Sequence, residues 1–200
     1  HAQINQHFIY NTLNSVSCMA LLHQENEISQ VLGSLTKVIR YNLKKPDAIV
    51  HLEEELENIY SWCRIQECCY EQSIRFSYDI QVPADQIKIP KLIIQPLIEN
   101  AVVHGANFAG EDARICLHIW MEGKCLYIVV WDNGTDVDTD RINRLACGKG
   151  EVCSDSLGVR NVYERIRLRY GSAGQMRFEQ DEEHHTLVQI VIPAEMDQSL

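Results

Sequence analysis

The spacing of apolar residues changes near Ser73, and this change limits the folds that the chain can adopt. Up to about Glu71, apolar side chains recur every three or four residues, which is the period of an α-helix packed on one side. From Ser73 onward, segments such as residues 74–80 alternate between apolar and polar residues, as half-buried β-strands do. We therefore predict an α+β protein with a helical region at residues 1–72 and a second domain at residues 73–200.

The helical region is predicted to hold two long helices. The first runs from Ile4 to about Leu43, with an interruption indicated near residues 23–26. Pro46 ends it, because proline fixes its own backbone and disfavours a helical residue before it. The second helix runs from about His51 to Glu71. Because the break between the two helices is short, we expect them to pack as an antiparallel hairpin.

The second domain is predicted to contain both strands and helices. Its helices are IPKLIIQPLIENAVVHG, with Pro90 before it and Pro96 near its first turn, and LGVRNVYERIRLRYG, which ends at Gly171. Strands are expected at residues 74–80, 113–120, 125–131, 176–180 and 186–192, with a hairpin turn at residues 122–124. Residues 132–157 form a polar stretch too long for an ordinary connector, so we expect a lid at about residues 135–157.

Composition and charge exclude several kinds of partner. The chain has 18 Lys and Arg against 28 Asp and Glu, a net charge of −10 and no basic stripe, so we expect no nucleic-acid partner. No apolar run reaches the roughly 18 residues of a membrane helix. The eight cysteines show no paired CxxC spacing, and we expect reduced cytosolic thiols rather than disulfides or a zinc site. The start at His1, inside an apparent helix, suggests a fragment of a longer protein.

Three short segments of the second domain combine polar residues with glycines. In PLIENAVVHG, Glu99, Asn100 and His104 share or adjoin one helical face. In WDNG, Asp132 follows a predicted strand and the glycine allows a sharp turn. In SLGVRN, Gly158 begins a helix whose exposed N–H groups attract phosphate. Each segment alone also has an ordinary structural explanation: a solvated helical Asn, an Asp-Asn-Gly turn and a simple helix start.

A histidine lies in the apolar, helix-compatible stretch QINQHFIYNTLN, residues 3–14. His7 is either a packed core side chain or a group that becomes chemically modified. A neutral imidazole is a competent nucleophile near neutral pH without a strong base. Asn11, four residues later, lies on the same helical face and is a candidate to orient the imidazole or a hydrolytic water.

Together and in this order, the three segments of the second domain resemble the N, G1 and G2 boxes of the GHKL (Bergerat) ATP-binding fold. That fold is an α/β sandwich shared by histidine kinases, type II topoisomerases, heat-shock chaperones and mismatch-repair ATPases. The stretch QINQHFIYNTLN resembles the phosphoacceptor motif of the YesM/LytS-type sensor histidine kinases, and LEEELENIYSWCRIQ follows in that family's order. The resemblance covers nearly the entire chain. It implies the cytoplasmic kinase core of a bacterial two-component sensor that is anchored in the cell membrane by N-terminal sensor segments.

The resemblance also implies roles for single residues. Asp132 would accept a hydrogen bond from the adenine amine, and Gly134 would leave room for the base. Asn100 would give an oxygen to Mg²⁺, which binds a few protein oxygens together with phosphate and water. His7 would attack the γ-phosphorus of ATP in line, with Asn11 and Glu99 as further catalytic residues. The other candidates for nucleotide binding are His104, Lys149, Gly158, Asn161 and Arg165.

Some of these residues have plainer explanations. His104 could form only the wall of the pocket, Lys149 could be a solvated loop residue, and Arg160 and Arg165 could make exposed salt bridges. Four positions depart from the family pattern. Cys69 stands where arginine is common, and Ser156 stands where the G2 box often has another glycine. Gln6 replaces a usual proline, and Asp136 replaces a second glycine of the G1 box.

The predicted activity is autophosphorylation of His7 from Mg-ATP, followed by transfer to an aspartate in the receiver domain of a response regulator. We expect a homodimer. One alternative is a nucleotide-binding dimerisation module without phosphotransfer, which Gln6 and Asp136 favour. Another is a hydrolysing GHKL ATPase. Pro96 disfavours the hydrolase, because it stands where hydrolysing relatives carry the carboxylate that activates water.

Overall fold

The computed structural model of the chain describes residues 6–45, 48–69, 74–104, 112–134, 138–146 and 157–197. The chain divides into two compact units, one of residues 1–46 and 56–72 and the other of residues 47–55 and 73–200. The division falls inside helix α3 (Leu52–Cys69), whose first turn belongs to the second unit. Residues 47–55 thus belong with the sheet-containing unit, although the sequence analysis assigns them to the helical region.

The first unit contains a helical hairpin formed by α1 (Gln6–Leu22) and α2 (Asn26–Asn42). The interruption predicted near residues 23–26 is confirmed: Gln24 adopts a positive φ of 62° in the turn between the helices. The hydroxyl oxygens of Ser17 and Ser29 lie 2.9 Å apart where α1 and α2 pack. The sequence predicts a hairpin between a helix at residues 4–43 and a helix at residues 51–71. That pairing was wrong, because the hairpin forms between α1 and α2, which together correspond to the first predicted helix.

A small antiparallel sheet in the second unit was missed by the sequence analysis. It consists of β1 (Ile49–His51), β3 (Ile87–Pro90) and β8 (Glu195–Met196), in the order β1-β3-β8. Strands of two to four residues are too short to show an alternating pattern. Two helices therefore start later than predicted. Helix α3, expected from about His51, begins at Leu52 after β1, and α4, expected directly after Pro90, begins at Gln95.

The main sheet of the second unit has five strands in the order β2-β4-β5-β7-β6. These are β2 (Ile74–Ile80), β4 (Ala113–Glu122), β5 (Cys125–Asp132), β6 (Gln175–Gln180) and β7 (Thr186–Pro193). β2 pairs with β4 in parallel, and the other pairs are antiparallel. Gly123 closes the β4–β5 hairpin with a φ of 61°, a conformation that glycine adopts without strain. All five predicted strands are confirmed to within about two residues.

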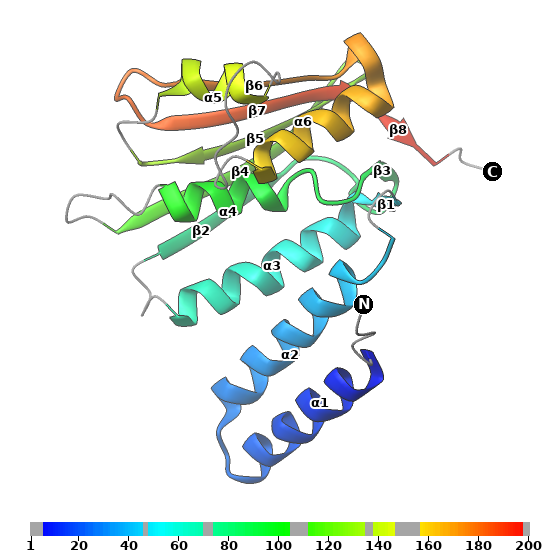
Figure 1. The fold of residues 1–200 in the computed structure, drawn as a ribbon, viewed down its shortest axis with the longest axis vertical. Helices are drawn as coiled ribbons and strands as arrows, with labels where there is room; N and C mark the ends of the chain where they lie inside the picture. Colours follow the sequence, from blue (N-terminus) through cyan, green and yellow to red (C-terminus); the bar gives the residue numbers. More distant parts are fainter. Residues whose placement is uncertain are drawn as a thin grey trace. The chain divides into compact units, whose positions relative to one another are not determined.

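Three helices form the second layer of this unit: α4 (Gln95–His104), α5 (Thr139–Ala146) and α6 (Leu157–Tyr170). Helix α6 contacts both α4 and α5, and each helix contacts the main sheet (Figure 1). A short 3₁₀ turn, η3 (Gly171–Ala173), follows α6 where the sequence predicts the helix end. The core between the layers is aliphatic, with Leu97, Ile115, Ile128, Val162 and Ile190 almost fully buried. The expected α/β sandwich is therefore confirmed.

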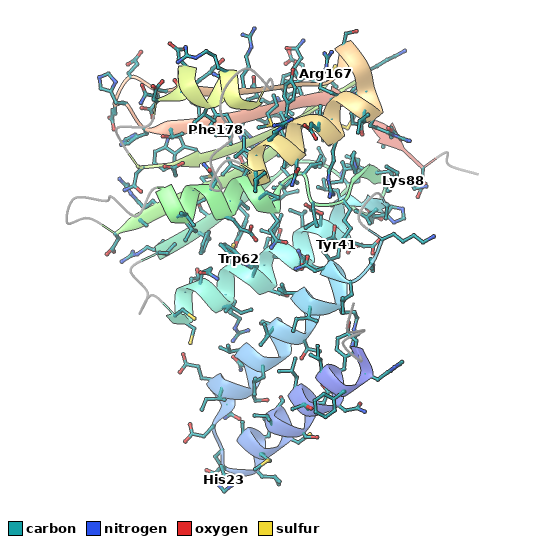
Figure 2. All side chains as sticks on the ribbon, in the orientation of Figure 1. His23, Tyr41, Trp62, Lys88, Arg167 and Phe178 are labelled. Atoms are coloured by element: carbon teal, nitrogen blue, oxygen red, sulfur yellow. The ribbon has the colours of Figure 1, made fainter. Side chains whose placement is uncertain are left out.

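Part of the stretch expected to be a lid is helical. Within residues 135–157, α5 covers Thr139–Ala146 and is fixed to β6 by Asn143. The side-chain amide of Asn143 donates to the carbonyl of Phe178 at 2.8 Å, and its oxygen accepts from the Phe178 N–H at 2.9 Å. Phe178, which Figure 2 labels, lies on β6. Residues 135–137 and 147–156 lie outside the described residues. Within the described part of the chain, none of the helices has the length and apolar character needed to cross a membrane.

Candidate functional site

A buried carboxylate ends the central strand of the main sheet. In β5 the alternation buries Leu126, Ile128 and Val130 toward the helices, and Asp132 continues that series, with 5% of its surface exposed. Its Oδ1 accepts a hydrogen bond from the N–H of Gly134 at 3.0 Å. The alternation that forms β5 therefore also buries the carboxylate of Asp132 between the sheet and the helices.

The surroundings of Asp132 make the ionised form unfavourable. Burial raises its pKa to about 7, while the N–H of Gly134 and the nearby imidazole of His185 act in the opposite direction. A buried carboxylate is stabilised by a donor that reaches it. The exocyclic amine of adenine is such a donor, so the site fits the base that the sequence analysis assigns to it.

The residue between Asp132 and Gly134 has a structural role. The side-chain amide of Asn133 donates to the carbonyl of Asp112 at 3.2 Å, and its oxygen accepts from the N–H of Arg114 at 2.7 Å. The segment after β5 is therefore fixed to the start of β4. This fixes the backbone at Gly134, which the sequence analysis expects to face the base.

Thr186 is a candidate site residue that the sequence analysis missed. It lies directly opposite Asp132 in the β5–β7 pairing and is buried, with 4% of its surface exposed. Its hydroxyl donates to the carbonyl of Gly134 at 3.4 Å. Only the strand register brings these residues together, because a threonine at the start of a strand is ordinary in sequence.

Helix α4 carries the candidates of the first motif. Glu99 and Asn100 are half-buried, and the amide of Gln95 donates to Glu99 at 2.6 Å, one turn away. Burial raises the pKa of Glu99, and the hydrogen bond from Gln95 partly opposes this. Helix α4 contacts β5, the strand that ends at Asp132. The side chain of His104, the last residue of α4, lies outside the described residues.

Helix α6 carries the candidates of the third motif. Gly158 and Asn161 are exposed in its first turns. A methyl group added at Gly158 would lie 3.6 Å from the Cβ of Pro96, so the start of α6 lies beside the first turn of α4. The guanidinium of Arg165 donates to the carbonyl of Lys91 at 2.5 Å. Arg160 makes an exposed ion pair with Glu164 at 2.8 Å, as its plainer explanation predicts.

The remaining candidates belong to the first unit or fall outside the described residues. His7 and Asn11 are exposed on α1, in the first unit. His7 is therefore not a buried core side chain, and the carbonyl of Asn11 accepts a hydrogen bond from Ser15 at 2.8 Å. Lys149 and Asp136 fall outside the described residues. Within the second unit, β5 contacts β7 and α4, and α6 contacts β7 and α4.

The donor set near α4 suits a magnesium ion shared with a nucleotide. Among the described residues, no group of three or more His, Cys, Asp or Glu side chains could hold a metal ion by itself. Asn100 offers a neutral oxygen, and Mg²⁺ is commonly held by one or two protein oxygens together with phosphates and water. The oxygen of Asn100 therefore fits an ion that is shared with a triphosphate.

Comparisons with known proteins match two families in succession along the chain. The family described as "Histidine kinase" matches residues 1–74, and the family described as "Histidine kinase-, DNA gyrase B-, and HSP90-like ATPase" matches residues 84–196, more than half of the chain. The sensor histidine kinase YesM of Bacillus subtilis is 33% identical over 96% of this chain. The sensor histidine kinase YpdA of Escherichia coli is 30% identical over 88%, and the sensor protein LytS of Streptococcus mutans is 28% identical over 93%.

The chain spans about a third of the length of these curated relatives: 32% of YesM, 31% of YpdA and 32% of LytS. The catalytic domain of histidine kinase ThkA is similar in structure, with a TM-score of 0.56 at 17% identity, covering 74% of this chain and 96% of that one. ThkA in complex with the response regulator protein TrrA matches with a TM-score of 0.52 at 13% identity, covering 95% and 60%.

At these identities the two structures show the fold alone, whereas the family matches rest on sequence. The chain therefore belongs to the histidine kinase-, DNA gyrase B- and HSP90-like ATPase family, and it joins this domain to a histidine kinase region as the YesM/LytS-type sensor histidine kinases do.

Proposed function

We propose that this chain is the catalytic core of a sensor histidine kinase that binds Mg-ATP in its second unit and phosphorylates its own His7. The observation that carries the proposal is the buried acid at the end of β5, which lies opposite Thr186 in the β5–β7 pairing, on a strand that contacts α4. A core carboxylate with a pKa of about 7 destabilises the folded protein at neutral pH unless a ligand donates to it.

The residues of the second unit would hold the nucleotide at both ends. Asp132 accepts the adenine amine, and Gly134 and Thr186 line the same strand ends. The first N–H groups of α6, from Leu157 onward, have no partners within the helix and can donate to phosphate. Asn100 gives an oxygen to Mg²⁺, which supplies positive charge to the phosphate oxygens when it is bound.

His7 would be the phosphoryl acceptor. A lone pair of its imidazole forms the new N–P bond as the bond between the γ-phosphorus and the ADP oxygen breaks, and ADP leaves with that electron pair. The imidazole proton is released, and Glu99, whose pKa is raised by burial, is the candidate to accept it. Asn11 lies one turn after His7 on α1 and is the candidate to orient the ring.

The second substrate is proposed to be an aspartate on a response regulator, as the TrrA complex of the similar ThkA structure suggests for this class. We propose that the working form is a homodimer, anchored in the bacterial membrane by segments outside this chain. A nucleotide-binding module without phosphotransfer is the second candidate, favoured by Gln6 and by Asp136.

The test is labelling of the chain with Mg-ATP carrying a radioactive γ-phosphate. We expect acid-labile, base-stable label on the protein that disappears in His7→Gln. His23→Gln is a matched control, because His23 is also an exposed histidine of the first unit, in the turn after α1. Unlabelled protein that nevertheless binds ATP would favour the binding module. Phosphate release without labelled protein would favour an ATPase.

A further inference from the structure

One acidic side chain of α3 is buried although its acidic neighbours reach solvent. The first turn of α3 carries Glu53, Glu54 and Glu55, and Glu55 alone is fully buried, with 0% of its surface exposed. One carboxylate oxygen accepts the N–H of Leu92 at 2.8 Å, and the other accepts the N–H of Ile94 at 3.2 Å. Such charge-assisted bonds are roughly twice as strong as neutral ones. Glu55 therefore holds the segment between β3 and α4 by its backbone.

The same segment is held from other directions. The N–H of Lys91 donates to the carbonyl of Ala48 at 3.0 Å, and the Lys91 carbonyl accepts the guanidinium of Arg165 at 2.5 Å. The peptide group that joins Lys91 to Leu92 is thus bonded at its oxygen by Arg165 and at its nitrogen by Glu55. Leu92 has a φ of 59°, a left-handed conformation that a leucine keeps only where its surroundings impose it.

This segment sets the start of helix α4. The carbonyl of Ile94 accepts the N–H groups of Leu97 at 3.0 Å and Ile98 at 3.3 Å, so Ile94 is the residue from which the helix is built. Its own N–H is one of the two that Glu55 accepts. The position of Ile94 fixes where the helix begins, and therefore where Asn100, six residues further, lies. Arg165 on α6 is bonded to the same segment, so it also links the start of α4 to the helix that carries Gly158.

We propose that Glu55 is a positioning residue of the nucleotide site: it fixes the Lys91–Ile94 segment and, through it, places Asn100 for the metal-bound phosphates. This inference rests on the proposed function, since it concerns the same site. It predicts that Glu55 acts on the magnesium-phosphate end of the nucleotide and leaves adenine binding at Asp132 intact. A side chain needed only for folding would weaken both ends alike.

The test compares Glu55→Gln with Glu53→Gln in the whole chain. The glutamine that replaces Glu55 would keep the shape of the side chain but would turn an amide group toward one of the two N–H donors. Glu53 is exposed in the same turn, so its substitution removes the same charge without touching the segment. Affinities are measured by calorimetry for a non-hydrolysable ATP analogue with Mg²⁺ and for ADP without Mg²⁺. Hydrogen exchange is measured on the α4 amides without nucleotide.

We expect Glu55→Gln to weaken binding of the magnesium-bound analogue about tenfold, and ADP binding without Mg²⁺ by less than about twofold. Glu53→Gln should match wild type in both. The exchange of α4 amides should rise in Glu55→Gln alone. In an Asn100→Ala background, Glu55→Gln should have no further effect on the magnesium-bound analogue, because coupled residues are not additive.

Equal losses for both ligands, unchanged binding of both, or additive effects with Asn100→Ala would each overturn the proposal. If Glu55→Gln does not fold, Glu55→Asp replaces it, because the shorter carboxylate keeps the charge but cannot reach both N–H groups. Folded wild-type protein that binds no nucleotide would instead contradict the proposed function. In that case the exchange of the α4 amides still decides whether Glu55 positions the helix.

Discussion

Asp132 shows how one residue can be unfavourable for folding and useful for binding. It occupies a position that the strand pattern reserves for an apolar side chain, and burial raises its pKa to about 7 from an ordinary 3.8. The folded protein therefore binds a proton more tightly at this site than the unfolded chain does. Between about pH 4 and pH 7 the unfolded state releases that proton first, so stability must fall as pH rises through this window.

Asp132→Asn should remove this pH dependence, because an amide does not ionise. Relative to wild type, the variant should gain stability as pH rises from 4 to 8, by at most roughly 4 kcal/mol, because burial raises the Asp132 pKa from 3.8 to about 7. Urea unfolding at a series of pH values measures it. Glu122→Gln, an exposed carboxylate on β4, serves as the control. A constant difference between Asp132→Asn and wild type would contradict the elevated pKa. The variant should also bind adenine nucleotides more weakly.

At the scale of elements, the start of α6 is a place where a substitution can weaken binding without weakening the fold. A methyl group at Gly158 would meet Pro96 at 3.6 Å, which is an ordinary van der Waals contact. The fold has room for the added carbon, and alanine favours a helix over glycine by up to about 1 kcal/mol. A phosphate held against the N–H groups of this turn would meet the same methyl group.

Gly158→Ala should therefore leave the melting temperature unchanged or higher, while Mg-ATP affinity falls about tenfold. Differential scanning calorimetry and titration of the nucleotide give the two values. Gly33→Ala is the matched control, because Gly33 lies inside α2 with no atom near an added Cβ, and it should raise stability without changing affinity. Full affinity in Gly158→Ala would argue that phosphate lies elsewhere.

At the scale of the whole molecule, α1 presents apolar side chains that its partner helix does not cover. Phe8, Met19 and Leu22 are 69%, 59% and 82% exposed. They fall on one side of the helix at steps of eleven and three residues, while Leu13 and Ala20 on the other side are less exposed. In the proposed homodimer, a second copy of the chain would cover these side chains.

Met19→Glu should weaken dimerisation, because it would bury a charge in that interface. Sedimentation equilibrium measures the dissociation constant, and we expect an increase of at least about tenfold. Asn14→Glu adds the same charge on another side of α1 and should leave the dimer intact. Both variants should keep nucleotide binding, since α1 belongs to the first unit. Equal dissociation constants for Met19→Glu and wild type would place the interface elsewhere.

The sequence alone determined the elements whose signal is local. Strand-like segments of five or more residues predicted the five strands of the main sheet, and glycines marked the β4–β5 turn and the end of α6. The order of the motifs indicated the family, whereas the role of His7 as an acceptor stays a prediction. These features are encoded within a few neighbouring residues, and a period of two or of about 3.6 is readable there.

Only the tertiary structure decided which distant residues meet. The pairing of Asp132 with Thr186 depends on strand register, and the bonds from Glu55 to Leu92 and Ile94 join residues 37 and 39 positions apart. The buried state of Glu55 has no local signal, since its acidic neighbours in the same helical turn stay in water. Burial and pairing are set by long-range packing, which places a backbone donor beside one carboxylate and solvent beside the next.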